Sequence, residues 1–320
     1  MTVAELKAQA TPSRSVSTFR HILVATDFSE ASRRALCSAL ELAAGGDAQV
    51  SVVNILQPDR QYDALEQPPE LDLERIDAER QLKRLVGELA PQRKIDTILI
   101  KRGPVADKVA ALIEAEGIDL LVIGTRGRGG LRKLALGSVA EELLRVAPCP
   151  VMTIGPKADI QATTHGPGFH TILFATDFGP GSKRAVPLAL ALAKAEQARL
   201  ILLHMIAPMP ATSASLSAYA PAGAAADELE EWEGTSRKRA FRELREFLPA
   251  KHGLAQDPEY VVGTEFLPEG VLSAVGRFRV DLIVMGANRS GSPRAVAHIP
   301  WTAVHEVVRN APCPVLTVAG

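Results

Sequence analysis

Ile22-Leu23-Val24-Ala25-Thr26-Asp27-Phe28 is the stretch that decides the fold, because the chain repeats it 150 residues later as Ile172-Leu173-Phe174-Ala175-Thr176-Asp177-Phe178. Two further blocks recur in the same order: DLLVIG at 119–124 returns as DLIVMG at 281–286, and APCPV at 147–151 returns at 311–315. A repeat of this length indicates a duplicated domain rather than a solenoid of short units. At about 150 residues per domain, a chain of 320 residues accommodates both copies.

The boundary between the copies is predicted at 155–168, where the sequence GPKADIQATTHGPG is rich in Gly, Pro and Thr. A second low-complexity stretch, Thr212–Ala226, is predicted to form a loop inside the second copy. We therefore expect four segments: a flexible tail over 1–18, a first domain over 19–155, a linker over 156–168 and a second domain over 169–320.

Short apolar runs alternate with helical stretches through each copy. In the first copy we expect strands over 22–25, 50–56, 97–101, 120–124 and 151–154, separated by helices over 29–44, 70–89, 105–116 and 138–146. This alternation predicts an α/β fold class, with two doubly wound domains that each contain a five-stranded parallel sheet flanked by helices. In such sheets ligands bind beyond the carboxyl ends of the strands, where the strand order reverses.

The composition excludes several classes of protein. Lys and Arg number 36, Asp and Glu number 37, and 4% of residues are aromatic, so no nucleic-acid partner is expected. Residues 1–18 lack the apolar core of a secretory signal, and no apolar run approaches the length of about 18 residues that a membrane span needs. Three cysteines cannot form a disulfide framework, and the absence of a CxxC pair excludes a zinc ribbon. We expect a cytoplasmic protein with no membrane partner.

A glycine-rich segment follows the strand predicted over 120–124. Gly124 and Gly127 are separated by two residues, and Gly137-Ser138 follow after nine more, where the next helix is predicted to begin. Glycine lets the backbone approach a phosphate, and the N–H groups of a helix N-terminus attract anions. Neither G-x-x-x-x-G-K-[ST] nor G-x-G-x-x-G is present, so the segment is predicted to be another kind of phosphate loop. Positive charge surrounds it, from Arg126, Arg128, Arg132 and Lys133.

Two predictions concern the starts of helices near this segment. Ser138-Val-Ala-Glu141 has the pattern of a capping box, in which Ser138 caps the helix. Asp27 follows the first strand, and its spacing leaves two interpretations equally open: an acceptor for ribose hydroxyls, or the N-cap of the following helix. A catalytic acid is not favoured, because no second carboxylate or histidine recurs beside it in the sequence.

Three motifs together resemble those of the universal stress protein family in its tandem form: the G-2x-G-9x-GS pattern, the first-strand sequence VATDFS and the closing sequence APCPV. The resemblance covers about residues 19–155 and 169–319. It implies domains that bind an adenine nucleotide and that pair through their last strands, 151–154 against 315–318. It also implies a homodimer or a higher homo-oligomer.

The resemblance implies ATP as the ligand, together with Mg²⁺. It places Asp27 at the ribose and adenine, Ala25 and Thr26 along the same edge, and Ile55 at the adenine. The residues expected at the triphosphate are Gly124, Arg126, Gly127, Gly137, Ser138 and Val139.

The second copy departs from this pattern. Gly286 is followed by four residues, Gly291, nine residues and Trp301-Thr302, and His305 replaces the glutamate of the capping box. An indole where a phosphate needs bare backbone should obstruct binding. Loss of one contact with a charged group costs about 1.5–3 kcal/mol, roughly tenfold to a hundredfold in affinity. We expect the first domain to bind ATP and the second to bind it weakly or not at all.

Other chemistry-bearing residues are predicted to be structural. Cys149 and Cys313 each lie between prolines and are expected to be small buried residues. The seven histidines show no metal spacing, and His204, on an apolar strand, is expected to be a core histidine with satisfied hydrogen bonds. The charged segment 228–247 is expected to be a solvated helix.

The sequence therefore predicts an ATP-binding regulatory or stress-response protein with little or no hydrolysis, rather than an enzyme. One alternative is a scaffold that binds protein partners or an apolar ligand without a nucleotide. The other, an ATP-using transferase or pyrophosphatase, is disfavoured, because the first loop reads Thr26-Asp27-Phe28-Ser29 and not His-x-Gly-His or Ser-Gly-Gly-x-Asp-Ser.

Overall fold

The structure is a computed structural model that describes residues 18–44, 46–57, 72–90, 95–125, 136–158, 168–206, 224–287 and 301–320. The first half contains, in chain order, β1 (His21–Ala25), α1 (Glu30–Ala44), β2 (Gln49–Leu56), α2 (Leu73–Leu89), β3 (Thr97–Arg102), α3 (Val105–Glu116), β4 (Leu120–Gly124), α4 (Ser138–Val146) and β5 (Val151–Ile154). The second half contains β6 (Thr171–Ala175), α5 (Pro180–Ala195), β7 (Arg199–Met205), α7 (Ala224–Phe247), β8 (Glu259–Gly263), α8 (Leu267–Phe278), β9 (Leu282–Ala287), α9 (Trp301–Asn310) and β10 (Val315–Ala319).

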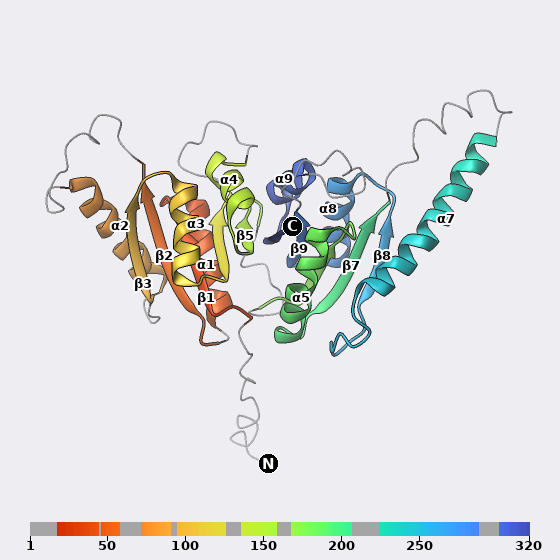
Figure 1. Cartoon of the computed structure of the whole chain (residues 1–320), viewed down its shortest axis with the longest axis horizontal. Coiled ribbons are helices and arrows are strands. Elements are labelled where there is room, and N and C mark those ends of the chain that lie inside the picture. Colours follow the sequence, from red (N-terminus) through yellow and green to blue (C-terminus); the bar gives the residue numbers. More distant parts are fainter. Residues whose placement is uncertain are drawn as a thin grey trace, which may run out of the picture.

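All ten strands belong to one sheet, with the order β3-β2-β1-β4-β5-β10-β9-β6-β7-β8. Within each half the strands are parallel, whereas β5 and β10 pair antiparallel, with Leu316 opposite Met152. Figure 1 shows the two halves side by side, with β5 and β10 near the middle and α2 and α7 at opposite ends. The strand order reverses between β1 and β4 in the first half and between β6 and β9 in the second.

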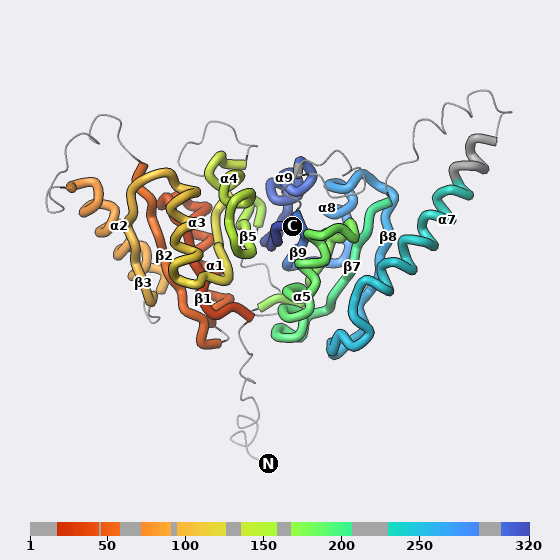
Figure 2. The backbone as a smooth tube through the Cα atoms, viewed as in Figure 1, coloured from red at the N-terminus to blue at the C-terminus, as the bar shows by residue number. Residues whose placement is uncertain are grey.

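Helices cover both faces of the sheet and divide the core into three clusters. One face carries α1, α2, α5 and α7 over a single cluster that includes Val24 and Phe174 and continues across the seam through Met152 and Leu316. The other face carries two separate clusters, under α3 and α4 in the first half and under α8 and α9 in the second. Figure 2 follows the chain through this arrangement and shows α7 extending outward beyond the sheet. The two halves therefore share one continuous core as well as a strand pairing.

The α/β class and the flanked parallel sheets predicted from the sequence are confirmed, and the elements of the first half lie within three residues of their predicted bounds. The prediction of a loop over 212–226 was wrong at its end, because α7 begins at Ala224. Residues 1–17, 159–167 and 207–223 lie outside the described part of the chain, so the predicted tail and linker remain predictions. Within the described residues, no helix is both long enough and apolar enough to cross a membrane.

Candidate functional site

The turn between β1 and α1 places Asp27 at the carboxyl edge of the sheet. Asp27 Oδ1 accepts the Ser29 N–H at 3.0 Å, and Phe28 adopts a φ of +64°. The cap of α1 comes from Ser29, whose hydroxyl accepts the N–H of Ser32 at 3.2 Å. Of the two interpretations of Asp27, the N-cap is therefore excluded, because Ser29 performs that function. The Asp27 carboxylate instead stands at the end of β1, beside the reversal of strand order.

A buried polar network holds this turn in place. Asn54 on β2 donates to the Thr26 carbonyl at 2.8 Å, and the Thr26 hydroxyl donates to Ser32 Oγ at 2.9 Å while accepting the Phe28 N–H. Ser32 in turn donates to the Ser29 carbonyl at 2.9 Å. Sequence reasoning missed Asn54, although a single amide in the apolar run Val50–Leu56 was a signal. Because buried amides need partners, Asn54 positions the strand end that carries Asp27.

Gly124 ends β4 directly beneath the start of α1. A Cβ built on Gly124 would lie 2.5 Å from the Ala31 carbonyl carbon and 2.7 Å from its oxygen. Glycine at this position is therefore required for α1 to cross the strand end, quite apart from any ligand. The neighbouring Ala25 pairs with Ile123 of β4, so Asp27 and Gly124 follow adjacent strands.

The start of α4 returns to the same edge of the sheet. The Gly137 N–H donates to the Thr125 carbonyl at 2.9 Å, which joins the end of β4 to the start of α4. Gly137 is the N-cap, and no side-chain hydrogen bond caps the helix. The predicted capping box was wrong: Ser138 is the first helical residue and is exposed, so its hydroxyl lies one position too late to cap. The first turn of α4 therefore has no capping side chain, and N–H groups at a helix N-terminus attract anions.

The remaining predicted site residues divide into two groups. Ile55 lies half-buried near the end of β2 and pairs with Lys101 of β3, and Val139 is half-buried in the first turn of α4. Arg126 and Gly127 lie outside the described residues, as do the other basic residues of the loop, Arg128, Arg132 and Lys133. In the described part of the chain, no three His, Cys, Asp or Glu side chains lie close enough to hold a metal ion.

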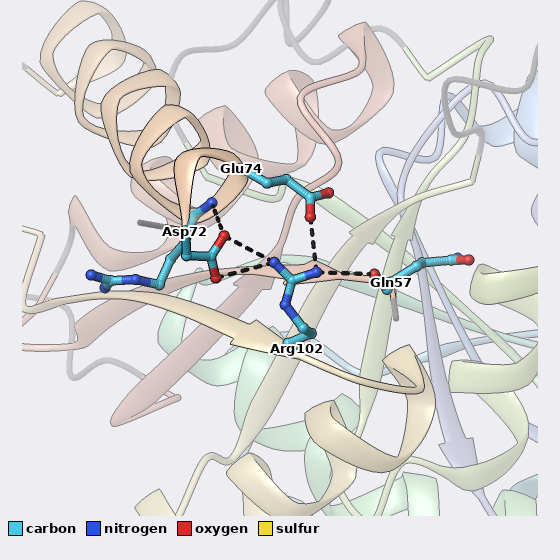
Figure 3. Close-up of polar contacts among 5 residues, drawn as sticks. Gln57, Asp72, Glu74 and Arg102 are labelled. Atoms are coloured by element: carbon cyan, nitrogen blue, oxygen red, sulfur yellow. Dashed lines mark hydrogen bonds and ion pairs between the residues drawn. The ribbon is translucent and has the colours of Figure 1, made fainter. Parts of the chain in front are cut away.

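Arg102, at the end of β3 and opposite Leu56 of β2, links the ends of β2 and β3 to the start of α2 (Figure 3). Its guanidinium lies 3.1 Å from each Asp72 carboxylate oxygen and 2.8 Å from Glu74 Oε2, both at the start of α2, and 3.5 Å from the Gln57 carbonyl after β2. The Arg75 N–H and the Arg102 guanidinium hold the pKa of Asp72 below its usual range. We call Arg102, Asp72 and Glu74 the β3–α2 clamp. Sequence reasoning missed it, because the contact depends on how α2 docks.

We expect Arg102→Gln to lower the free energy of unfolding by about 1 kcal/mol at neutral pH, since it removes the charge from a partly buried network. Because the pKa of Asp72 is depressed in the folded state, this contribution is present above the ordinary carboxyl pKa of about 3.9 and is lost as the pH falls through the folded value. Urea unfolding at pH 7 and at about pH 3 measures the difference. Arg80→Gln is the control, since its pair with Asp77 is exposed at 3.9 Å. An equal loss for Arg102→Gln at both pH values would contradict the electrostatic explanation.

The corresponding turn of the second half is built differently. Position 179 is glycine, so α5 has no side-chain cap there. The fully buried Ser182, which corresponds to Ser32, instead donates to Asp177 Oδ1 at 2.6 Å, and the Gly179 N–H donates to the same oxygen at 2.8 Å. The Asp177 carboxylate is therefore bound to a side chain of its own helix, α5.

The strand neighbours of this second turn also differ. His204 replaces Asn54: it bonds the Thr176 carbonyl through Nδ1 at 2.9 Å and stacks on Phe178 with ring centres 4.4 Å apart. Burial lowers the pKa of His204, which favours the neutral ring. The hydrogen bond agrees with the prediction of a satisfied histidine, but the side chain is half-buried and not part of the core.

The structure describes only some of the residues at which the glycine-rich segment of the second half, 286–302, differs from that of the first. Gly291 and the side chain of Trp301 lie outside what the structure describes, while Thr302 is exposed in the first turn of α9. Cys149 and Cys313 are buried as predicted, and burial raises the pKa of the Cys313 thiol to about 12.

Comparison with known proteins gives a consistent result. The model of the family described as "Universal stress protein family" matches residues 18–155 and again residues 168–319. Universal stress protein A homolog 1 of Coxiella burnetii is 34% identical over 146 residues, which are 43% of this chain and 98% of that protein. Universal stress protein YxiE of Bacillus subtilis is 27% identical over 146 residues, 42% of this chain and 99% of that protein.

Solved structures agree on the fold. The crystal structure of a universal stress protein from Archaeoglobus fulgidus has a TM-score of 0.60 at 19% identity and covers 95% of this chain and 97% of its own. A second, from Pseudomonas aeruginosa UCBPP-PA14, has a TM-score of 0.55 at 16% identity and covers 94% of this chain and 93% of its own. At these identities the likeness concerns the arrangement of both halves and not their ligands.

Proposed function

The chain belongs to the universal stress protein family, with two domains of that family in tandem, and from this premise we propose that it binds ATP with Mg²⁺ in its first half and acts as a nucleotide-responsive regulatory protein. The proposal places it in the cytoplasm, as a homodimer or higher homo-oligomer, with little or no hydrolysis. Binding would shift a conformational or oligomeric equilibrium by the difference in ATP affinity between the two states.

The observation that carries the proposal is the convergence of two strand ends and one helix start in the first half. Asp27 after β1, Gly124 at the end of β4 and Gly137 at the start of α4 meet at one edge of the sheet, joined by the Gly137–Thr125 hydrogen bond. The uncapped first turn of α4 suits the phosphates, and the Asp27 carboxylate suits the ribose hydroxyls. Ile55 and the end of β2 would border the adenine.

The second half supports the restriction of ATP to the first. Its Asp177 accepts a hydrogen bond from the buried Ser182, and its sequence has Trp301 at the position of Gly137. A ribose hydroxyl that bonds Asp177 Oδ1 would compete with the Ser182 hydroxyl, and loss of that hydrogen bond would leave a buried donor without a partner at a cost of about 1–3 kcal/mol.

The experiment is to measure the nucleotide that the purified full chain carries or takes up. We expect about one ATP per chain after denaturation and chromatography, and loss of that ATP in Gly127→Val/Gly137→Val, because side chains at these positions block the approach of the phosphates. Trp301→Val, which places the same residue at the corresponding position of the second half, is the matched control and should leave the stoichiometry unchanged. Absence of nucleotide, with no binding when ATP is added back, would overturn the proposal in favour of a nucleotide-independent scaffold.

A further inference from the structure

A cavity of about 210 Å³ lies at the outer end of the second half, between β7, β8 and α8. Its apolar wall comes from Leu203, Val261, Ala274 and Phe278, and its polar lining includes Arg237 of α7, Arg277, Glu265 and Ser273. It is separate from the candidate nucleotide site, which lies in the first half. We call it the β8–α8 pocket.

Three residues that line the pocket are smaller than their equivalents in the first half. Strands β3 and β8 begin at Thr97 and Glu259, which pair with equivalent residues of β2 and β7, and α3 and α8 are both 12 residues long. At this offset of 162 residues, Lys101, Lys108 and Leu112 of the first half correspond to Gly263, Gly270 and Ala274 of the second. Leu112 is 7% exposed and fills its part of the first half.

Two glycines that line the pocket, Gly263 and Gly270, lie against a flexible side chain. A Cβ built on Gly263 or Gly270 would lie within 2.6 Å or 2.1 Å of the Met205 methyl group, so Met205 occupies the space that the two glycines leave. Methionine adapts its shape readily, and Met205 can therefore adjust to a ligand without movement of the backbone.

The charges of the pocket favour an anion. Arg237 and Arg277 form no ion pair with any residue in the described ranges, whereas Glu265 supplies one carboxylate at the other end of α8. Arg277 is two helical turns from Gly270, about 10 Å, and its guanidinium carbon lies 5.0 Å from the centre of the Phe278 ring. Arg199, on the same ring at 5.7 Å, is already paired with Glu259. The Arg277 guanidinium thus lies beside the apolar wall of the pocket, where it can bind the carboxylate of a ligand.

We propose that the β8–α8 pocket binds a small organic carboxylate with a compact apolar body, its carboxylate at Arg277 and Arg237 and its body against Val261, Ala274 and Phe278. A cavity of about 150 Å³ holds a benzene molecule, so a volume of about 210 Å³ suits a ligand with one ring and a carboxylate. This inference does not depend on the proposed binding of ATP in the first half.

The test is a titration of the ¹⁵N-labelled full chain with benzoate and with benzamide, which have the same shape and differ in charge. We expect benzoate to bind at least tenfold more tightly than benzamide and to shift amide signals of β8 and α8. Arg277→Gln should remove most of that tenfold preference. Arg242→Gln, an equal charge change on an exposed residue of α7 outside the pocket, should leave the preference unchanged.

Ala274→Leu restores the residue of the first half and should abolish the binding of both compounds by filling the pocket. If that variant fails to fold, the exposed Arg277→Gln still decides the question, because it alters no buried side chain. Equal affinities for benzoate and benzamide, shifts confined to other elements, or unchanged preference in Arg277→Gln would each overturn the proposal. Loss of ATP binding in the first half would leave this result unaffected, so the two proposals fail separately.

Discussion

Gly286→Ala should lower the free energy of unfolding by about 3 kcal/mol or more, the upper part of the range for overpacking. A Cβ on Gly286 would lie 2.2 Å from both the Gly181 carbonyl carbon and the Ser182 nitrogen. These are backbone atoms at the start of α5, so no side chain can rotate away to make room. The helix would have to shift from the sheet, which would disturb the buried Ser182–Asp177 hydrogen bond as well.

Urea unfolding of the full chain, followed by circular dichroism, measures this loss. Gly276→Ala is the matched control: Gly276 lies inside α8 with nothing within 4 Å of its built Cβ, so alanine there should stabilise the protein by about 0.5–1 kcal/mol. The same change at two glycines of one domain thus has opposite expected signs. A stability for Gly286→Ala equal to that of the parent would mean that α5 does not cross β9 as closely as the structure has it.

The same crossing in the first half changes how the glycine pattern is interpreted. Gly124 lies under Ala31 as Gly286 lies under Gly181. Since both halves need this first glycine for packing, its presence does not distinguish a half that binds a nucleotide from one that does not. The discrimination between the halves rests on the later position, Gly137 against Trp301, and on the turn that carries the aspartate.

Hydrophobic periodicity was enough to predict the order of strands and helices, because strands buried on both faces leave continuous apolar runs. It could not predict the helix cap at α4. The pattern Ser138 to Glu141 is compatible with a capping box, but the Gly137–Thr125 hydrogen bond starts the helix one residue earlier. The choice depends on where β4 ends in space, and a local pattern does not contain that information.

The contacts that support the candidate site could not be predicted from the sequence for the same reason. Arg102 and Asp72 are 30 residues apart, and their pairing requires α2 to dock beside the end of β3. The core shared by the two halves likewise follows from the antiparallel pairing of β5 with β10, which aligns Met152 and Leu316 on one face. Individual elements could therefore be predicted from the sequence, but contacts between distant elements required the structure.

Asp27→Ala should weaken ATP binding by the full chain about a hundredfold, whereas Asp177→Ala should leave it unchanged. A hydrogen bond to a charged group contributes about 1.5–3 kcal/mol, and about 1.4 kcal/mol corresponds to a factor of ten in affinity. Asp27 ends β1 beside the strand-order reversal, while Asp177 is bonded to Ser182 in the half that carries Trp301. Isothermal titration calorimetry on nucleotide-free protein measures both variants.

Asp27→Asn separates the contribution of the Asp27 charge to ATP binding from the contribution of its hydrogen bond to the turn. Its amide oxygen can still accept the Ser29 N–H, so the turn is retained while the negative charge is lost. We expect Asp27→Asn to keep the stability of the parent and to weaken ATP binding about tenfold, between the parent and Asp27→Ala. If Asp177→Ala weakened ATP binding as much as Asp27→Ala, the two halves would contribute equally to ATP binding. In that case neither the Ser182 hydrogen bond nor Trp301 would exclude the nucleotide, and the asymmetry between the halves would have to serve a ligand other than ATP.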